Sequence, residues 1–467
     1  MSMAAAISAP ALVKPRETYS PHSISEYVSE QGRILLHVFE ALERAGIRCC
    51  VLHGNEEFSG HIESDVDCII DSGASARVLL ALFHRDRDLI GAEVVRYLGS
   101  YFVFASRRAD GSHTFVALDF ATECDANDFA LYDGSEILAS RRRYGQFYIP
   151  APNLEFGAYL ARCIAKQGLS VDRTRRLSSL FGNDPARCAA QVARYWNDAN
   201  GECIVAAAQS GNWDLVRESL PNLHSELRWN TIKRNPTRFV ANKFRYVRGC
   251  IKRLLRPDGV SVVFLGPDGA GKSSTIEAIG PKLADIFPRS GCRGFAPGLL
   301  AFLRRGKGST SEPHGRPARS LPASLSRLVY WFAYHTFSFL PLRLALARST
   351  LVLYDRHFVD ILVDQKRYRY GGPIWMLQLL WRIIPKPDLV ILLDAPPEIL
   401  QARKQEVPLE ITARQRQAYL TLVQNLPNGR IVDASQPLAR VIDQTCEVIM
   451  RYAAERTRGT PRTSSNR

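Results

Sequence analysis

The 467-residue sequence lacks the cysteine patterns that mark zinc sites or a disulfide framework. Its ten cysteines are scattered, with no Cys-x-x-Cys pair and no cysteine–histidine spacing that suits zinc. These absences argue against a zinc-binding module and against a secreted, disulfide-stapled domain. We therefore expect reduced, buried thiols in a cytoplasmic protein.

We expect neither a secretory leader nor a transmembrane segment in the sequence. Residues 1–14 are rich in alanine but have no basic start and no sustained apolar core, so we expect a disordered N-terminus and no signal peptide. The longest apolar run, Leu328 to Leu342, is interrupted by His335 and Pro341 and is shorter than the roughly 20 residues that a bilayer span needs. We interpret this run as a pair of buried helices.

Acidic residues are absent from Arg228 to Arg256, where ten lysines and arginines alternate with aromatic residues in a chain of net charge +15. Three interpretations fit this composition: a solvated helix between domains, an amphipathic helix on anionic lipid, or a nucleic-acid-binding segment. Peripheral contact with a membrane through this segment therefore stays open. The sequence also allows a homodimer, whereas nucleic acid is the least favoured partner.

The sequence does contain a strand followed by a glycine-rich loop. Val260 to Leu265 is apolar and rich in β-branched residues, and it leads into the spacing G-x-x-x-x-G-K-S. Such a loop turns backbone N–H groups toward phosphate oxygens, places its lysine at the β- and γ-phosphates, and offers its serine to Mg²⁺. A phosphate-binding or degenerate loop is the alternative. The expected ATP-binding residues are Gly266, Gly269, Gly271, Lys272, Ser273 and Ser274, with Ser273 also a ligand of Mg²⁺.

Length and composition predict several domains rather than one, because a typical domain has about 150 residues. We expect a disordered segment at 1–21, a first domain at 22–222, a basic connector at 223–257, a second domain at 258–455 and a disordered tail at 456–467. Periodicity in the first domain predicts helices at 23–45, 155–166 and 185–196 and strands at 47–52, 64–70 and 115–120.

Three aspartates stand out in the first domain. Asp65 and Asp67 are two residues apart in a predicted strand, so their side chains share one face. Asp119 lies in another predicted strand and could complete a cluster that binds divalent metal. The alternative is an acidic pair at a strand end, next to a turn.

The order of helix, strand, small turn, D-h-D-h strand and later h-D-h strand resembles the nucleotidyltransferase fold of polymerase-beta-like enzymes. In that family the glycine turn usually ends in serine, whereas this sequence has His53-Gly54-Asn55. The departure weakens the expected contact with a triphosphate and puts nucleotidyl transfer in question.

The second domain offers two further strands that end in acids, Thr350 to Asp355 and Asp388 to Asp394. Continuous apolar strands between helices predict a parallel sheet covered on both faces, with ligands at the carboxyl ends of the strands. The glycine loop, Y-D-R-H at 354–357 and P-D-L-V-I-L-L-D-A-P-P-E at 387–398 resemble the thymidylate kinase family in order and spacing.

That resemblance implies roles for individual residues. Asp268 would face the acceptor, Asp355 would act through Mg²⁺ or its water molecules, and Arg356 would hold the acceptor phosphate and the transferred group. The glycine loop carries no basic residue between Gly266 and Gly271, so a mobile lid must supply the second cation. The candidates are Arg403 and Arg416, which could equally be solvated helix charges.

The acceptor side departs from the family. Where the family has R-E-P-G-G-T, this chain has Arg293 to Gly298, followed by a basic insertion to about Pro322. Arg367 and Arg369 form a second cationic cluster, which could hold an anionic acceptor or be a surface turn.

We therefore expect an α/β protein: a P-loop parallel sheet with helices on both faces, preceded by an α+β nucleotidyltransferase-like domain. The favoured function is ATP- and Mg²⁺-dependent phosphoryl transfer to a nucleoside monophosphate, dTMP by resemblance. One alternative is a kinase of a sugar phosphate or a lipid-linked glycan. Another is a nucleotide-gated binding module with vestigial chemistry.

Overall fold

The computed structural model describes residues 29–52, 62, 64–126, 129–293, 317–355, 357–405 and 408–459. Several predictions concern residues outside these ranges. They are the disordered segment 1–21, the turn at 53–55, Arg356, the basic insertion up to residue 316, and the end of the tail at 460–467.

The first part of the chain forms a mixed sheet in the order β1-β2-β5-β4-β3. β2 and β5 are parallel and the other pairs are antiparallel. Burial alternates along β5, so each face of the sheet receives every second residue. The elements are α1 (Glu30–Arg44), β1 (Cys49–Val51), β2 (Val66–Ile70), α2 (Ala76–Arg85), α3 (Arg87–Ile90), β3 (Glu93–Leu98), β4 (Tyr101–Arg107) and β5 (His113–Ala121).

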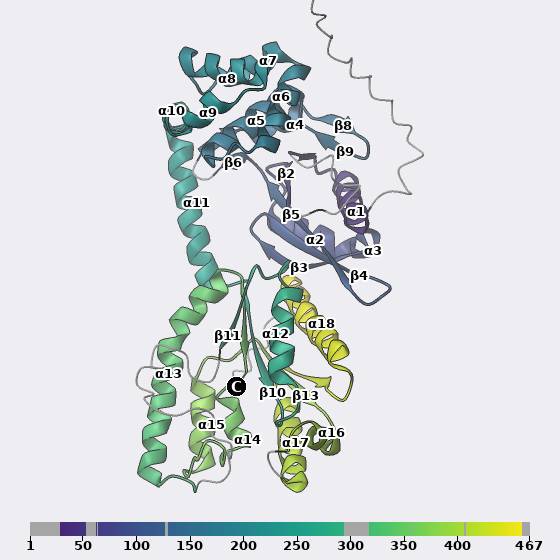
Figure 1. Cartoon of the computed structure of the whole chain (residues 1–467), viewed down its shortest axis with the longest axis vertical. Coiled ribbons are helices and arrows are strands. Elements are labelled where there is room, and N and C mark those ends of the chain that lie inside the picture. Colours follow the sequence, from purple (N-terminus) through teal and green to yellow (C-terminus); the bar gives the residue numbers. More distant parts are fainter. Residues whose placement is uncertain are drawn as a thin grey trace, which may run out of the picture.

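A mainly helical part follows the mixed sheet and builds a hydrophobic core around Phe156 and Trp213, which also includes Cys50 and Ile69 of the mixed sheet. Its elements are β6 (Cys124–Ala126), β7 (Phe129–Tyr132), α4 (Gly134–Ala139), β8 (Arg142–Tyr144), β9 (Phe147–Ile149), α5 (Pro152–Ala165), α6 (Val171–Asn183), α7 (Pro185–Val192), α8 (Asp198–Ser210), α9 (Asp214–Glu218) and α10 (Leu220–Arg234). The long helix α11 (Pro236–Leu255) then descends along one side of the molecule (Figure 1).

The last part is an entirely parallel sheet in the order β11-β12-β10-β13-β14. All of β10 is buried, as expected for a central strand covered on both faces. The P-loop α/β fold is therefore confirmed. Its elements are β10 (Val260–Leu265), α12 (Lys272–Lys282), β11 (Arg289–Arg293), α13 (Leu321–Ala347), β12 (Thr350–Tyr354), α14 (Val359–Val363), α15 (Ile374–Ile383), β13 (Leu389–Asp394), α16 (Pro397–Arg403), α17 (Leu409–Gln424), β14 (Gly429–Asp433) and α18 (Leu438–Thr457).

The two sheets are joined through α18. One face of the mixed sheet is covered by α1 and α2, while Val95 and Val103 on the other face belong to the same buried cluster as Val260 and Ile449 of the second sheet. Figure 1 shows α18 lying between the two sheets. The packing means that the basic segment is not the only link between the predicted domains.

The apolar run 328–342 is not the predicted pair of buried helices. It lies inside one helix, α13, which continues through Pro341. Much of that helix is exposed, including Val329 and Phe337. The prediction was wrong because the run was judged by hydropathy alone, whereas within the described residues only one side of the helix is packed against protein. No helix in the described ranges is both long and apolar enough to cross a membrane.

Candidate functional site

The glycine loop lies between the buried strand β10 and helix α12, as the sequence predicted. Gly266, Gly269 and Gly271 all have positive φ angles, of 145°, 86° and 84°. A side chain is also excluded by space, because a Cβ at Gly266 would lie 2.8 Å from the carbonyl oxygen of Leu393 and one at Gly269 would lie 2.6 Å from that of Leu400. Glycine at these positions is therefore required by both conformation and packing.

Lys272 is the first residue of α12 and folds back over the loop. Its ammonium group donates to the carbonyl oxygens of Gly266 and Pro267, at 2.7 and 2.9 Å. Ser273 and Ser274 follow it on the exposed first turn of the helix. A cation, two hydroxyl-bearing residues and the positive end of a helix are thus gathered at one loop, which suits a bound anion such as phosphate.

Two carboxylates stand at the ends of the strands that flank β10. Asp355 follows β12, which pairs with β10 through Val263 and Tyr354. Asp394 ends β13 on the other side of β10 and accepts hydrogen bonds from two guanidinium nitrogens of Arg416, Nε and Nη2, at 2.7 and 2.8 Å. The parallel sheet therefore brings both acids to the edge that carries the phosphate loop, where such folds bind their ligands.

Asp268, in the glycine loop, pairs with Arg367 at 2.5 Å, and both side chains are mostly shielded from solvent. The sequence singled out both residues but did not predict this contact, since 99 positions separate them. Arg369 behaves differently, because it donates to the carbonyl oxygen of Pro317 instead. Of the two arginines proposed to hold an acceptor, Arg367 is thus the one beside the phosphate loop.

The predicted lid residues lie on α16 and α17. Arg403 ends α16 and donates to the carbonyl oxygen of Ala434, at 2.8 Å, in the loop after β14. Arg416 is engaged by Asp394, as described above. In the described state both arginines therefore have partners within the protein, and their delivery to a phosphoryl group stays a prediction.

His357 follows Arg356 in the Y-D-R-H sequence but is a packing residue. Its ring lies within 6 Å of the rings of His335, Tyr354 and Trp381, and its backbone N–H donates to Asp360. Burial holds the pKa of His357 well below its usual value, with His335 and Lys386 adding to the effect. The side chain is therefore neutral near pH 7.

The three aspartates of the first sheet lie near one another, and their binding of a metal ion stays a prediction. Asp67 and Asp119 are direct neighbours in the pairing of β2 with β5, and Asp67 is bound by Arg162 at 2.8 Å. Burial raises the pKa of Asp119; a hydrogen bond from Ser100 opposes the rise, and Asp67 and Asp65 add to it. Among the described residues, no group of three or more His, Cys, Asp or Glu side chains is placed to hold a metal ion.

Comparisons with known proteins find thymidylate kinases among the proteins similar to this chain. No family model matches the chain. A thymidylate kinase of Limosilactobacillus fermentum is 30% identical over 227 residues, covering 42% of this chain and 97% of that protein. One from Leuconostoc mesenteroides is 28% identical, covering 40% and 94%. The solved thymidylate kinase of Ehrlichia chaffeensis aligns at 17% identity and a TM-score of 0.30, over 41% of this chain and all of that one. Through about two-fifths of its length, the chain belongs to the thymidylate kinase family.

Proposed function

We propose that this chain is a cytoplasmic kinase that transfers the γ-phosphoryl group of ATP to a nucleoside monophosphate, with dTMP as the favoured acceptor. The observation that carries the proposal is the phosphate loop itself, in which Lys272 lies over two loop carbonyls at the carboxyl edge of a parallel sheet. The thymidylate kinase relatives, which the chain covers almost completely, support the choice of reaction.

The residues at this edge fit a nucleotide triphosphate with Mg²⁺. The exposed Ser273 and the half-buried Asp355 are oxygen donors, the ligand type that Mg²⁺ prefers. Mg²⁺, when bound, neutralises the charge that builds up on the phosphate oxygens. Lys272 would leave the carbonyl oxygens of Gly266 and Pro267 for the phosphates, and the backbone N–H groups of the loop would orient the same oxygens.

The acceptor would bind on the side of the loop that carries Asp268. In this proposal Arg367 serves two purposes: it fixes the carboxylate of Asp268, and it places a guanidinium group where an acceptor phosphate can be held. Arg356 is the second proposed contact for that phosphate. Arg403 and Arg416 would close from α16 and α17 onto the transferred group, with Arg416 exchanging Asp394 for phosphoryl oxygens.

A screen of acceptors tests the proposed function. The purified full chain is incubated with γ-labelled ATP, Mg²⁺ and one acceptor at a time: nucleoside monophosphates, sugar phosphates and lipid-linked sugars. We expect label in dTMP above all, and none without acceptor beyond slow hydrolysis. Transfer only to a sugar phosphate or a glycan would replace the favoured acceptor while keeping the kinase. Nucleotide binding without transfer to any acceptor would favour the other alternative, a nucleotide-gated binding module with vestigial chemistry.

For the first part of the chain we propose a nucleotidyltransferase-like fold, on the strength of its mixed sheet and the adjacent Asp67 and Asp119. We propose that these residues do not hold a catalytic metal ion, because Arg162 pairs with Asp67 in the described structure and a cation would have to displace it. We therefore derive no metal-dependent step for this part. We propose that its role is structural and that it does not catalyse a second reaction.

Calorimetric titration with Mn²⁺ checks this assignment. We expect the full chain and its Asp67→Asn, Asp119→Asn double variant to give the same heat, since the ion pair with Arg162 excludes a cation from Asp67. A heat that is present in the wild-type chain and lost in the double variant would restore Asp65, Asp67 and Asp119 as a metal site. Circular dichroism on both proteins controls for unfolding.

A further inference from the structure

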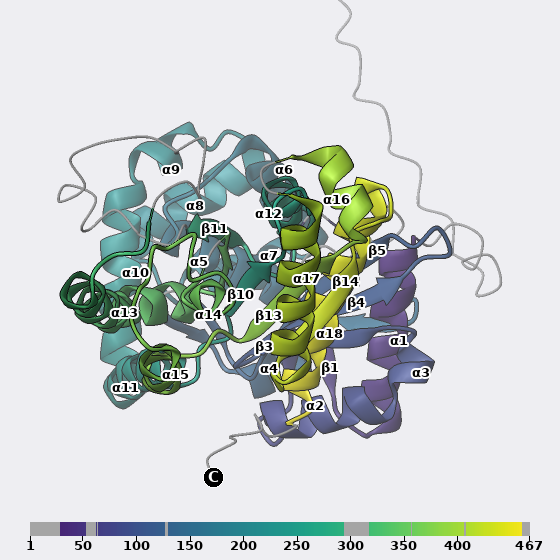
Figure 2. The same cartoon turned by 90° about the horizontal axis from the view of Figure 1, so that it is seen from below.

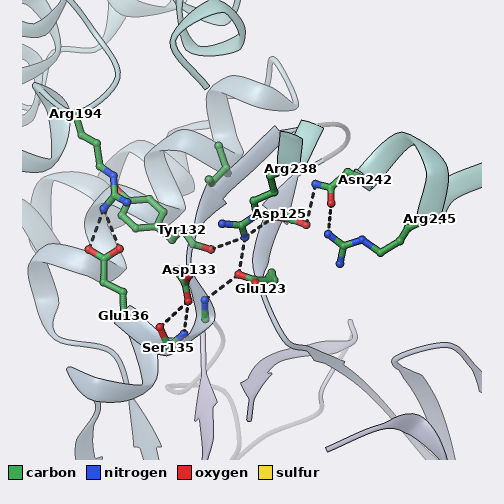
Figure 3. A network of polar contacts seen from close by, with 12 residues as sticks. Glu123, Asp125, Tyr132, Asp133, Ser135, Glu136, Arg194, Arg238, Asn242 and Arg245 are labelled. Atoms are coloured by element: carbon green, nitrogen blue, oxygen red, sulfur yellow. Dashed lines mark hydrogen bonds and ion pairs between the residues drawn. The ribbon is translucent and has the colours of Figure 1, made fainter. Parts of the chain in front are cut away.

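Helix α11 lies almost entirely outside the hydrophobic cores. None of its twenty residues is buried. Arg238 and Asn242, one turn apart, reach Glu123 and Asp125 at 2.5 and 3.3 Å. Figure 3 shows these contacts between α11 and the two acids, of which Glu123 directly precedes β6 and Asp125 lies in it. One side of α11 is thus turned toward the body of the protein by polar contacts.

The opposite side of α11 carries an apolar stripe. Val240, Phe244, Val247 and Ile251 recur at spacings of four, three and four residues, which places them on one side of a helix. Successive residues are about 100° apart on a helix, so Val240 is rotated by roughly 200° from Arg238. The stripe therefore faces solvent, and the side chain of Phe244 is 77% exposed.

Cations border this stripe. Lys243 and Arg248 lie on its two sides in the helical projection, and Lys252 follows one turn after Arg248. No acidic residue occurs between Arg228 and Arg256. An apolar stripe bordered by lysine and arginine is the pattern of helices that lie in the interface of an anionic bilayer.

Helix α13 also has an exposed apolar side, and this helix is longer than α11. Val329, Phe337 and Leu340 are 66%, 71% and 64% exposed and share one side of the helix. Trp331, on the opposite side, is fully buried against Phe358, with ring centroids 5.9 Å apart. Residues 321–347 include no aspartate or glutamate. The exposed side of α13 is thus apolar and free of negative charge.

The two helices are tied to each other on one side of the molecule. Arg343 of α13 donates to the carbonyl oxygens of Leu254 and Leu255 at the end of α11, at 2.5 and 2.7 Å. Figures 1 and 2 show α11 and α13 along the same side of the molecule, at the left of each view, with both sheets to their right. The side of each helix opposite its apolar stripe contacts the body of the protein. Both apolar stripes therefore face solvent.

We propose that this α11–α13 face docks on the surface of an anionic phospholipid bilayer. The face comprises Val240, Phe244, Val247 and Ile251 of α11 and Val329, Phe337, Leu340 and Leu344 of α13. Helices of 20 and 27 residues run for about 30 and 40 Å, a length that suits a plane rather than a compact pocket. Lys243, Arg248 and Lys252 of α11 provide the charge complementarity, and no acid on either helix opposes it. The proposal does not depend on which acceptor the kinase uses.

Vesicle sedimentation with the purified full chain tests the proposal. We expect the protein to pellet with vesicles of phosphatidylcholine and phosphatidylglycerol at 70:30, and to stay in solution with phosphatidylcholine alone. Binding should weaken as salt rises from 50 to 300 mM, because the Debye length shortens from roughly 14 Å to less than 8 Å. Equal binding to both vesicle types, or no binding to either, overturns the proposal.

Surface variants locate the contact, and all of them change exposed residues so that the fold is spared. The apolar variant is Phe244→Ser, Ile251→Ser, Phe337→Ser and Leu340→Ser. The charge variant is Lys243→Gln, Arg248→Gln and Lys252→Gln. The matched control is Val171→Ser and Leu215→Ser, two exposed apolar residues on α6 and α9. We expect the charge variant to bind on the order of a hundredfold more weakly and the control to bind as wild type.

A second copy of the chain is the alternative occupant of this face, and its binding is measured separately. Sedimentation velocity on the wild-type chain and the apolar variant, without lipid, reports the oligomeric state. A dimer that is lost in the apolar variant, together with vesicle binding that is unchanged by either variant, overturns the proposal in favour of a second copy. Unchanged circular dichroism and ATP binding in each variant show that a loss of binding is not a loss of fold.

Discussion

Replacing Lys272 by alanine is expected to lower kcat for phosphoryl transfer by on the order of 10²–10³-fold, with little change in the fold. Its ammonium is the cation at the centre of the phosphate loop, held by the carbonyl oxygens of Gly266 and Pro267. Charge on the transferred group changes most in the transition state, so a cation placed there contributes to kcat more than to substrate affinity. The measurement is transfer of labelled γ-phosphate under saturating ATP and acceptor.

Lys282→Ala is the matched control, because Lys282 is the last residue of the same helix. Its ammonium pairs with Asp443 at 2.6 Å, and both side chains are about half exposed, so the pair contributes roughly 0–1 kcal/mol to stability. We expect this variant to turn over as the wild-type chain does. Wild-type turnover by Lys272→Ala, or an equal loss in Lys282→Ala, would contradict the assignment of Lys272.

Much of the site was predictable because its signals are local. The apolar run Val260–Leu265, the glycines and Lys272 are contiguous, and the structure places them as strand, loop and helix start. β12 and β13 are found within one residue of the strands predicted from apolar runs that end in acids. Each signal needed only periodicity and turn chemistry, not knowledge of distant neighbours.

The parts that were missed depend on contacts between distant residues. Asp268 and Arg367 are 99 positions apart, and no short sequence pattern predicts that they pair. Nor could the sequence tell whether the apolar residues of α13 would be covered, because that depends on how much of the helix the sheet can reach. The same limit applies to Asp67, since its partner Arg162 comes from a helix that begins 85 positions later.

The contact between the two sheets was the least foreseeable, and Arg96 contributes polar contacts to it. This residue of β3 reaches Asp258 at 2.8 Å, the carbonyl oxygen of Ile286 at 2.8 Å and the hydroxyl of Ser349 at 2.5 Å. Arg96 and Asp258 are only 8% and 10% exposed. The pairing register of β3 with β4 shifts between Val94 and Arg96, and such a bulge can redirect a side chain. An arginine inside a strand pattern gives no sign of such a shift.

Substituting Arg96 by methionine should therefore destabilise the protein by about 3–5 kcal/mol, because it leaves the carboxylate of Asp258 buried without its cation. Urea unfolding measures the change. Arg107→Met is the control, since Arg107 joins the same two parts through Glu447 at 3.4 Å, but at the surface, where a pair contributes roughly 0–1 kcal/mol. Adding Asp258→Asn to Arg96→Met removes the unpaired buried carboxylate, so the double variant should regain part of the lost free energy of unfolding. If Arg96→Met unfolds at the same urea concentration as Arg107→Met, the buried pair does not hold the two sheets together, and the shared apolar cluster of Val95, Val103 and α18 must do so alone.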